Sequence, residues 1–161
     1  MKSKGGLTVA LILVLAAMAA TPAHAASTRA EYVSQAETIC RAPASQLAGI
    51  ISQLNKVKKA APHLTPVQGA HRLGKILGRF ATLEASIFNQ LATLTPAPGD
   101  EQTVAQWLQG ERSANTLVFS AARAGKHGHL RGLLRILNQS ISAATQANQI
   151  VAGWGFQACV F

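Results

Sequence analysis

Apolar side chains recur at steps of three and four residues along most of the chain, which is the spacing of one face of an α-helix. The first such segment begins after Thr28, which with Glu31 forms the Thr-x-x-Glu pattern of a helix capping box. Because proline removes a backbone donor and clashes with the preceding turn, we expect Pro43 to kink this helix or split it in two. Its inward positions are Tyr32, Ala36, Ile39, Pro43, Leu47, Ile50, Leu54 and Val57.

A second segment of helical spacing begins at Thr65-Pro66, where an N-cap residue precedes a proline in the first helical turn. The stretch AAPHLTP at 60–66 separates it from the first segment. Its apolar seam consists of Ala70, Leu73, Leu77, Phe80, Glu84, Ile87, Leu91 and Leu94. The stretch TPAPGD at 95–100 ends this helix, and we expect a third helix to begin near Asp100 or Glu101.

The third segment has an inward face with polar interruptions: Val104, Leu108, Glu111, Asn115, Val118 and Ala122, with Trp107 beside them. After RAGKHGHLRGLLR at 123–135, the fourth segment presents Leu130, Leu134, Leu137, Ile141, Ala144, Asn148 and Val151, and ends near Gly153. Because short links favour antiparallel neighbours, we predict an all-α fold, an antiparallel four-helix bundle with its first helix kinked or split at Pro43.

The N-terminal residues have the three parts of a secretory signal peptide. Lys2 and Lys4 precede an apolar run at 7–20, and Ala23-His24-Ala25 is a small-x-small cleavage signal. The run is shorter than the roughly 20 apolar residues that span a bilayer, although an uncleaved anchor is the alternative. We therefore predict a cleaved signal peptide at 1–25 and a single helical domain at 26–161, without a later transmembrane segment and located outside the cell or in its envelope.

The two cysteines, Cys40 and Cys159, are an even number in a chain expected to be exported, which favours a disulfide over two free thiols. The bond would close a loop of about 120 residues, and chain-entropy arguments assign such a closure roughly 4 to 5 kcal/mol of stabilisation.

Positive charge is concentrated in particular segments. Removing Lys2 and Lys4 leaves 13 basic and six acidic residues, a formal net charge of +7. No acid occurs between Glu37 and Glu84, or after Glu111. In the predicted bundle, ten of the 13 basic residues gather at one end, which we call the basic pole: Lys56, Lys58, Lys59, Arg72, Lys75, Arg79, Arg123, Lys126, Arg131 and Arg135. Such a cluster attracts counter-ions or an anionic partner, or serves only to solvate the protein.

The histidines raise the question of a metal site at the same pole. His63, His127 and His129 fall on the two links there, with His71 about two turns along the second helix. Imidazole is a good ligand for zinc, copper or nickel, so these three residues are an alternative metal site. Ten nearby cations and the lack of a carboxylate count against it. We expect exposed loop histidines and no cofactor.

Catalytic motifs are not evident. A buried Glu84 or Glu111 would be a candidate catalytic acid, but Glu84 and Arg41 fall at similar depth, so an inter-helix ion pair is the simpler interpretation. The sequence shows no Ser-His-Asp order, no paired carboxylates, no cysteine beside a histidine and no phosphate-binding glycine loop. We therefore predict that the protein is not an enzyme.

Three short motifs resemble those of small exported actinobacterial proteins: YVSQAETIC at 32–40, LATLTPAP at 91–98 and GFQAC at 155–159. They cover an early Tyr-x-x-x-Ala-x-x-Ile-Cys, a middle Leu-x-x-Leu-x-Pro-x-Pro and a closing Gly-Phe-x-x-Cys. The resemblance implies a secreted helical protein with a cysteine pair, and it transfers no functional residue.

These observations favour an exported, non-enzymatic protein that binds an anionic envelope polymer or lipid surface through the basic pole. The alternative is a small-molecule or metal carrier that uses the bundle interior or the loop histidines. We expect no specific nucleic-acid binding, because the basic segments contain Phe80 and little else aromatic for base stacking. The oligomeric state stays open.

Overall fold

The computed structural model describes residues 28–160, and within them all regular structure is helical. Five α-helices and one short 3₁₀ helix follow in order: α1 (Arg29–Arg41), α2 (Ala44–Ala60), η1 (Ala61–His63), α3 (Pro66–Leu91), α4 (Glu101–Lys126) and α5 (Leu130–Ile150). The predicted all-α fold is therefore confirmed. The predicted signal peptide, residues 1–25, lies outside the described residues.

The helix starts and the break at Pro43 follow the local sequence. The Thr28 hydroxyl accepts a hydrogen bond from the Glu31 backbone N–H at 3.2 Å, and the Glu31 carboxylate accepts one from the Thr28 N–H at 3.1 Å. Thr65 and Gln68 form the same reciprocal capping box at the start of α3. Pro43 lies between the end of α1 and the start of α2, so the first predicted helix is split.

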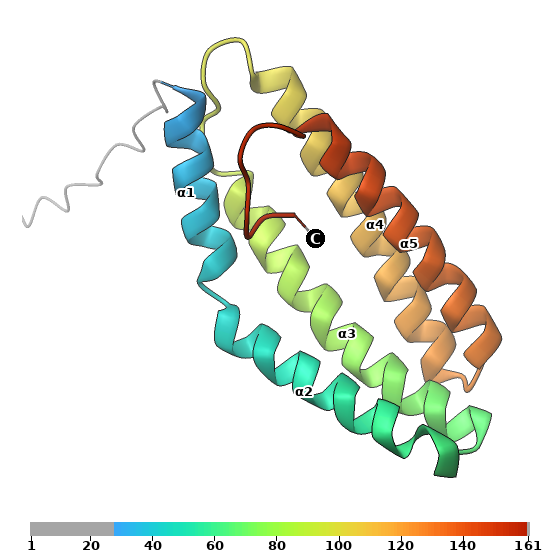
Figure 1. Ribbon diagram of the computed structural model, residues 1–161. Coiled ribbons are helices and arrows are strands. Elements are labelled where there is room, and N and C mark those ends of the chain that lie inside the picture. The colour runs from blue at the N-terminus through green and yellow to red at the C-terminus, as the bar shows by residue number, and fades with distance from the viewer. Residues whose placement is uncertain (1–27, 161) are drawn as a thin grey trace, which may run out of the picture.

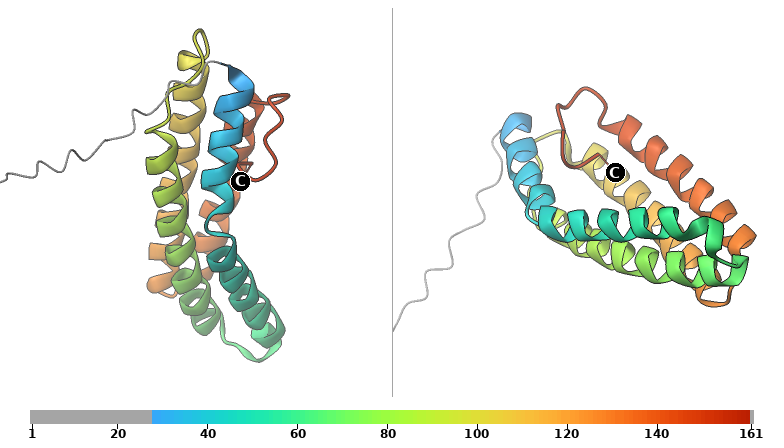
Figure 2. Two further views of the ribbon diagram at one scale, coloured as in Figure 1. Left: turned by 90° about the vertical axis from the view of Figure 1, so that its left-hand side faces the viewer. Right: turned by 60° about the horizontal axis from the view of Figure 1, so that its bottom comes forward.

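The helices α3, α4 and α5 alternate in direction, and α4 packs along both α3 and α5 (Figure 1). The helices α1 and α2 follow one another along α3, as two further views show (Figure 2). Among the described residues, α2 packs mainly against α3 and has little or no contact with α4 and α5. One side of the molecule between α2 and α5 is therefore left open.

The open side corrects part of the predicted core. Leu47 on α2, and Leu134 and Ile141 on α5, were expected to face inward, but they are 39%, 46% and 58% exposed. These side chains would be buried only if α2 and α5 packed together. On α5 the buried residues are instead Leu133, Ser140 and Ala147. The seams predicted for α3 and α4 hold better, because eleven of their positions are buried. Three of these are polar, namely Glu84, Glu111 and Asn115, and the other eight are Ala70, Leu77, Ile87, Leu91, Val104, Trp107, Leu108 and Val118.

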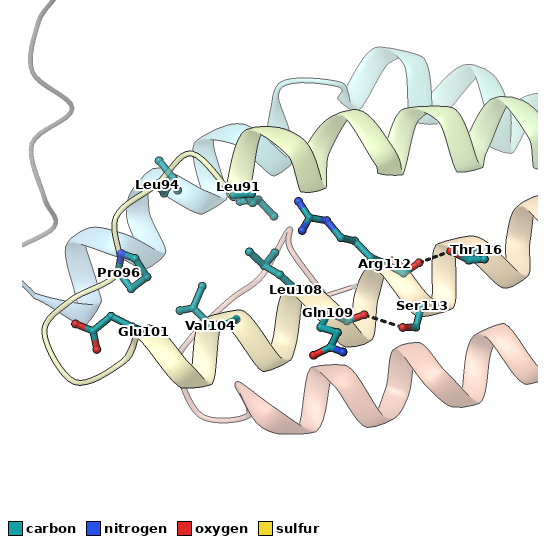
Figure 3. A pocket seen from close by; sticks show the side chains of 12 residues that line it. Leu91, Leu94, Pro96, Glu101, Val104, Leu108, Gln109, Arg112, Ser113 and Thr116 are labelled. Atoms are coloured by element: carbon teal, nitrogen blue, oxygen red, sulfur yellow. Dashed lines mark hydrogen bonds between the residues drawn. The ribbon is translucent and has the colours of Figure 1, made fainter.

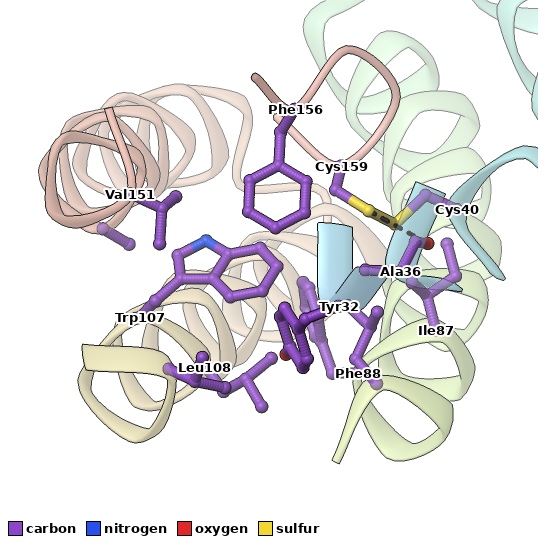
Figure 4. Close-up of a cluster of buried hydrophobic side chains, with 13 residues drawn as sticks. Tyr32, Ala36, Cys40, Ile87, Phe88, Trp107, Leu108, Val151, Phe156 and Cys159 are labelled. Atoms are coloured by element: carbon purple, nitrogen blue, oxygen red, sulfur yellow. Dashed lines mark hydrogen bonds between the residues drawn. A yellow bond between two sulfur atoms is a disulfide. The ribbon is translucent and has the colours of Figure 1, made fainter. Parts of the chain in front are cut away.

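The larger hydrophobic cluster lies where the C-terminal segment returns across α1, α3 and α4 (Figure 4). Trp107 stacks on Phe156 with ring centroids 5.0 Å apart, and Phe156 lies between Trp107 and Cys159 in Figure 4. Cys40 and Cys159 form the predicted disulfide, with Cα atoms 5.3 Å apart. A smaller cluster toward the other end consists of Leu77, Ala81, Val118, Ala121 and Leu133.

Glu37 on α1 holds the C-terminal segment in place. The Glu37 carboxylate accepts hydrogen bonds from the backbone N–H groups of Gln157, Ala158 and Cys159, at 2.7, 2.7 and 3.3 Å. Burial favours a higher pKa for Glu37, but these donors and Arg41 outweigh it, so the pKa is lowered. Arg41 pairs with Glu37 at 2.7 Å. The expected pair between Arg41 and Glu84 is therefore wrong.

Arg29 joins the start of α1 to the start of α4. Its guanidinium donates two hydrogen bonds to the Asp100 carboxylate, at 2.8 and 2.6 Å, and lies 4.5 Å from the centroid of the Trp154 ring. The hydrogen bond from Arg29 is the main reason that the pKa of Asp100 is lowered. This contact ties α1, the link before α4 and the C-terminal segment together.

Candidate anion-binding site

The basic pole forms at the end of the molecule where α2 ends, α3 begins, α4 ends and α5 begins, at the lower right of Figure 1. Lys56, Lys58 and Lys59 occupy the last two turns of α2, and Arg123 and Lys126 the last turn of α4. Arg72 and Lys75 lie in the first half of α3 and Arg131 at the start of α5, while Arg79 and Arg135 lie further along these helices. All ten side chains are exposed.

The charges of the pole are not neutralised by acids. Within residues 28–160 the two ion pairs are Arg29–Asp100 and Arg41–Glu37, and neither involves the pole. Arg79 donates to the side-chain oxygen of Gln53 at 2.9 Å, and Arg123 donates to the Ser120 hydroxyl at 2.8 Å. Ten exposed cations without a carboxylate partner produce a positive potential that extends about one Debye length, roughly 10 Å, into solution.

A cleft between α3 and α4 lies within the pole and has a volume of about 490 Å³. Three cations, Lys75, Arg123 and Lys126, line it from both helices. Its other lining residues are small or aromatic, apart from one histidine: His71, Gly74, Gly78, Phe119 and Ala122. The cleft thus presents three cations beside small and aromatic side chains, with no acid among the lining residues, which suits an anionic group.

Two helical glycines allow the close approach of α3 and α4 beside this cleft. A Cβ atom on Gly74 would lie 2.8 Å from the Ala122 carbonyl oxygen, and one on Gly125 would lie 2.6 Å from the Gly74 Cα atom. The backbones of α3 and α4 therefore touch here, which brings Lys75 and the last turn of α4 to opposite sides of one cleft. Sequence reasoning missed Gly74, Gly125 and Phe119. Gly74 lies four residues after Ala70 on the inward face of α3, and this spacing was a usable signal of close helix approach.

The three histidines of the alternative metal site do not form one. Within the described part of the chain, no three His, Cys, Asp or Glu side chains are grouped closely enough to hold a metal ion. The rings of His127 and His129 have centroids 6.3 Å apart, and His63 lies in η1. All three histidines are exposed. The link that carries His127 and His129 turns at Gly128, whose φ of 77° suits glycine.

The two candidate catalytic acids lie in a different cleft, among α3, α4 and α5. Asn115 donates to the Glu84 carboxylate at 2.8 Å and to the Ala81 carbonyl at 3.0 Å. Burial raises the pKa of Glu84 to about 7, against a smaller opposite effect of Asn115. Burial and then the charge of Glu84 raise the pKa of Glu111 to about 8, against a smaller opposite effect of the Trp107 indole.

A third groove runs along α4 beside the link between α3 and α4 (Figure 3). Leu94, Val104 and Leu108 form its apolar part, and Arg112 extends from α4 across the groove. The Arg112 guanidinium donates to the Phe88 carbonyl at 3.3 Å, near the C-terminal end of α3. Because Glu101 also lines this groove, its charge is balanced, and it is a weaker anion site than the cleft at the basic pole.

Comparisons of the chain with known protein families, with curated proteins and with solved structures find no match. None of the helices within residues 28–160 combines the length and the apolarity needed to cross a bilayer.

Proposed function

We propose that the protein is exported and binds an anionic polymer of the cell envelope through the basic pole, without catalysing a reaction. In this proposal residues 1–25 are a signal peptide removed on export, and the mature domain is an open form of the antiparallel four-helix bundle. The disulfide agrees with an oxidising compartment.

The observation that carries the proposal is the cleft between α3 and α4. Lys75, Arg123 and Lys126 line this cleft, and no acidic residue is among its lining residues. Arginine and lysine both bind phosphate groups through charge-assisted hydrogen bonds. A polymer with repeated phosphates would occupy the cleft with one group and contact the surrounding cations with the next.

Retention on immobilised long-chain polyphosphate, measured over a series of salt concentrations, tests this function. We expect strong retention at low salt and a steep loss as salt rises, because binding that neutralises several phosphates releases their counter-ions. Retention that does not change with salt would contradict the proposal. Vesicles containing an anionic lipid form a separate arm, and preference for them over polyphosphate would point to a surface instead.

Two triple variants with equal charge separate the cleft from the general field of the pole. One replaces Lys75, Arg123 and Lys126 by glutamine, and the other replaces Lys56, Lys58 and Lys59. Both lower the net charge by three, so a purely diffuse attraction predicts equal losses of affinity. We expect the cleft variant to lose at least about tenfold more affinity than the α2 variant. Equal losses would remove the cleft from the proposal.

A further inference from the structure

The cleft among α3, α4 and α5 lies apart from the basic pole and differs from it in chemistry. Its volume is about 260 Å³, near the lower end of the range of small-molecule sites. Phe80, Leu137 and Ile141 supply apolar walls. The 58% exposed Ile141 lies at its rim, on the open side of α5, so the cleft is accessible from solvent.

The polar groups of this cleft are acceptors more than donors. Both hydrogen bonds from the Asn115 amide are already used, one to Glu84 and one to the Ala81 carbonyl. The Ser140 hydroxyl donates to the Ala114 carbonyl at 3.0 Å. Of the residues lining the cleft, Glu84 and Glu111 are acidic and none is basic.

Glu111 is the unusual member of this set. Its side chain is among the largest fully buried ones, with the residue 1% exposed, and its Oε1 atom has no hydrogen-bond partner within residues 28–160. A buried acceptor left without a donor costs about 1 to 3 kcal/mol, and native structures seldom contain one without a reason. Trp107 Nε1 is likewise buried without an acceptor among the described residues and its indole acts on the pKa of Glu111, so this N–H lies near the carboxyl without forming a hydrogen bond of good geometry to it.

A ligand that donates a hydrogen bond to Glu111 is favoured further if it carries a positive charge. Glu84 and Glu111 are close enough that the charge of Glu84 raises the pKa of Glu111, while burial raises the pKa of both. A bound cation would offset this repulsion and the loss of hydration, and would favour the ionised carboxylates. A bound anion would face two buried acids without a compensating base.

We propose that this cleft binds a small organic monoamine with a compact apolar body, whose ammonium group donates to Glu111 Oε1 and lies beside Glu84. The apolar body packs against Phe80, Leu137 and Ile141. The proposal is independent of the basic pole, because the two clefts share no lining residue.

Three probes of similar shape test the charge requirement: benzylamine, benzyl alcohol and benzoate, titrated into the mature chain at neutral pH by calorimetry. We expect benzylamine to bind at least about tenfold more tightly than benzyl alcohol, and benzoate not to bind. Binding of the amine should also release protons, because ionised Glu111 is favoured in the complex, and buffers of different ionisation enthalpy measure this release. Equal affinity for amine and alcohol, or no binding of the amine at millimolar concentration, would overturn the proposal.

The variant Glu111→Gln keeps the size of the side chain and removes its charge. We expect it to fold at least as well as the parent chain and to lose at least about tenfold in benzylamine affinity. Glu101→Gln is the matched control, because it removes an exposed carboxylate in another groove and should leave binding unchanged. Unchanged benzylamine affinity in Glu111→Gln would refute the assignment. If this variant fails to fold, the probe series and the proton release on the parent chain still decide.

Discussion

The end of the molecule that carries the disulfide and the end that carries the basic pole are held together in different ways. At the disulfide end, five separate segments meet: α1, the end of α3, the start of α4, the end of α5 and the C-terminal residues. A covalent bond, the Arg29–Asp100 ion pair, the hydrogen bonds that Glu37 accepts from the C-terminal residues and stacked aromatic rings connect them. At the pole, the cluster of five buried apolar residues is smaller, and the helix ends carry exposed cations.

We infer that the disulfide end supplies most of the stability and that the basic pole supplies the charge. Ten like charges repel one another, and the pole holds them on helices whose packing is fixed at the opposite end of the molecule. On α2, which carries three of these charges, the single buried residue is Ile50. We expect the outer part of α2 to open locally at lower free energy than the disulfide end. Changes at the disulfide end should therefore alter stability most, and changes at the pole should mainly alter binding.

The largest expected effect comes from replacing both cysteines by serine. The unfolded chain then loses a closed loop of about 120 residues, which should lower the free energy of unfolding by roughly 4 to 5 kcal/mol. Urea unfolding of the variant and of the oxidised parent chain measures the difference. Polyphosphate retention of the folded variant should be unchanged, since the pole is distant from the bond. A stability loss below about 1 kcal/mol would mean that Glu37 and Phe156 hold the C-terminal segment without the bond.

The second effect concerns the carboxylate that binds the returning C-terminal segment. Glu37→Gln keeps an acceptor but removes the charge from three backbone N–H contacts, and should cost about 2 kcal/mol at neutral pH. Because folding lowers the pKa of Glu37, its contribution is present above the ordinary carboxyl pKa and is lost as pH falls through the folded value. Urea midpoints measured from neutral to acidic pH should therefore converge for the two proteins. Glu101→Gln is the control. A difference in urea midpoint between Glu37→Gln and the parent chain that stays constant with pH would contradict the stabilising role of ionised Glu37.

The third effect tests the close approach of α3 and α4 at the pole. Gly74→Ala places a methyl group against backbone atoms of α4 and should cost about 1 to 3 kcal/mol. Gly49→Ala is the matched change on α2, where nothing lies within 4 Å of the added atom, and should stabilise by about 0.5 to 1 kcal/mol. Thermal unfolding of both variants gives the comparison. Equal behaviour would show that the helices do not touch at Gly74.

Local signals in the sequence were sufficient for the helices and their ends. Thr28, Pro43 and Thr65 act on residues within four positions of themselves, so their effects on the helix ends can be predicted without knowing how the helices pack. Position along a helix and alternating direction also place most of the ten basic residues toward one end, but Arg79 lies at the middle of α3 and lines a cleft beside the break between α1 and α2. The disulfide followed from the count of two cysteines.

The spacing of apolar residues along the sequence does not predict which side chains are buried where two helices pack closely. On α5 the sequence favoured large residues such as Leu134 and Ile141, yet Ser140 and Ala147 are buried. The reason lies in the close packing of α4 and α5: a Cβ atom on Gly110 would lie 2.7 Å from the Ala147 Cβ atom. Hydrophobic periodicity ranks large side chains above small ones, so it selects the wrong face where two helices meet through small residues.

The smallest expected effect is that of Leu134→Ala, and its buried neighbour Leu133 is the reference for it. Leu133 is fully buried in the cluster near the pole, whereas Leu134 is 46% exposed. Leu133→Ala should cost about 2 to 5 kcal/mol, because it leaves a cavity, and Leu134→Ala should change stability by less than about 0.5 kcal/mol. Urea unfolding of the two variants measures both values.

The order of these two values distinguishes two arrangements of the same helices. In a closed bundle, Leu134 would pack against α2, and its loss would cost as much as the loss of other buried leucines. In the open arrangement, Leu134 faces solvent and α2 is held by α3. A large cost for Leu134→Ala would therefore mean that α2 and α5 pack together in solution. Such closure would cover Ile141, and with it the entrance to the cleft that contains Glu111.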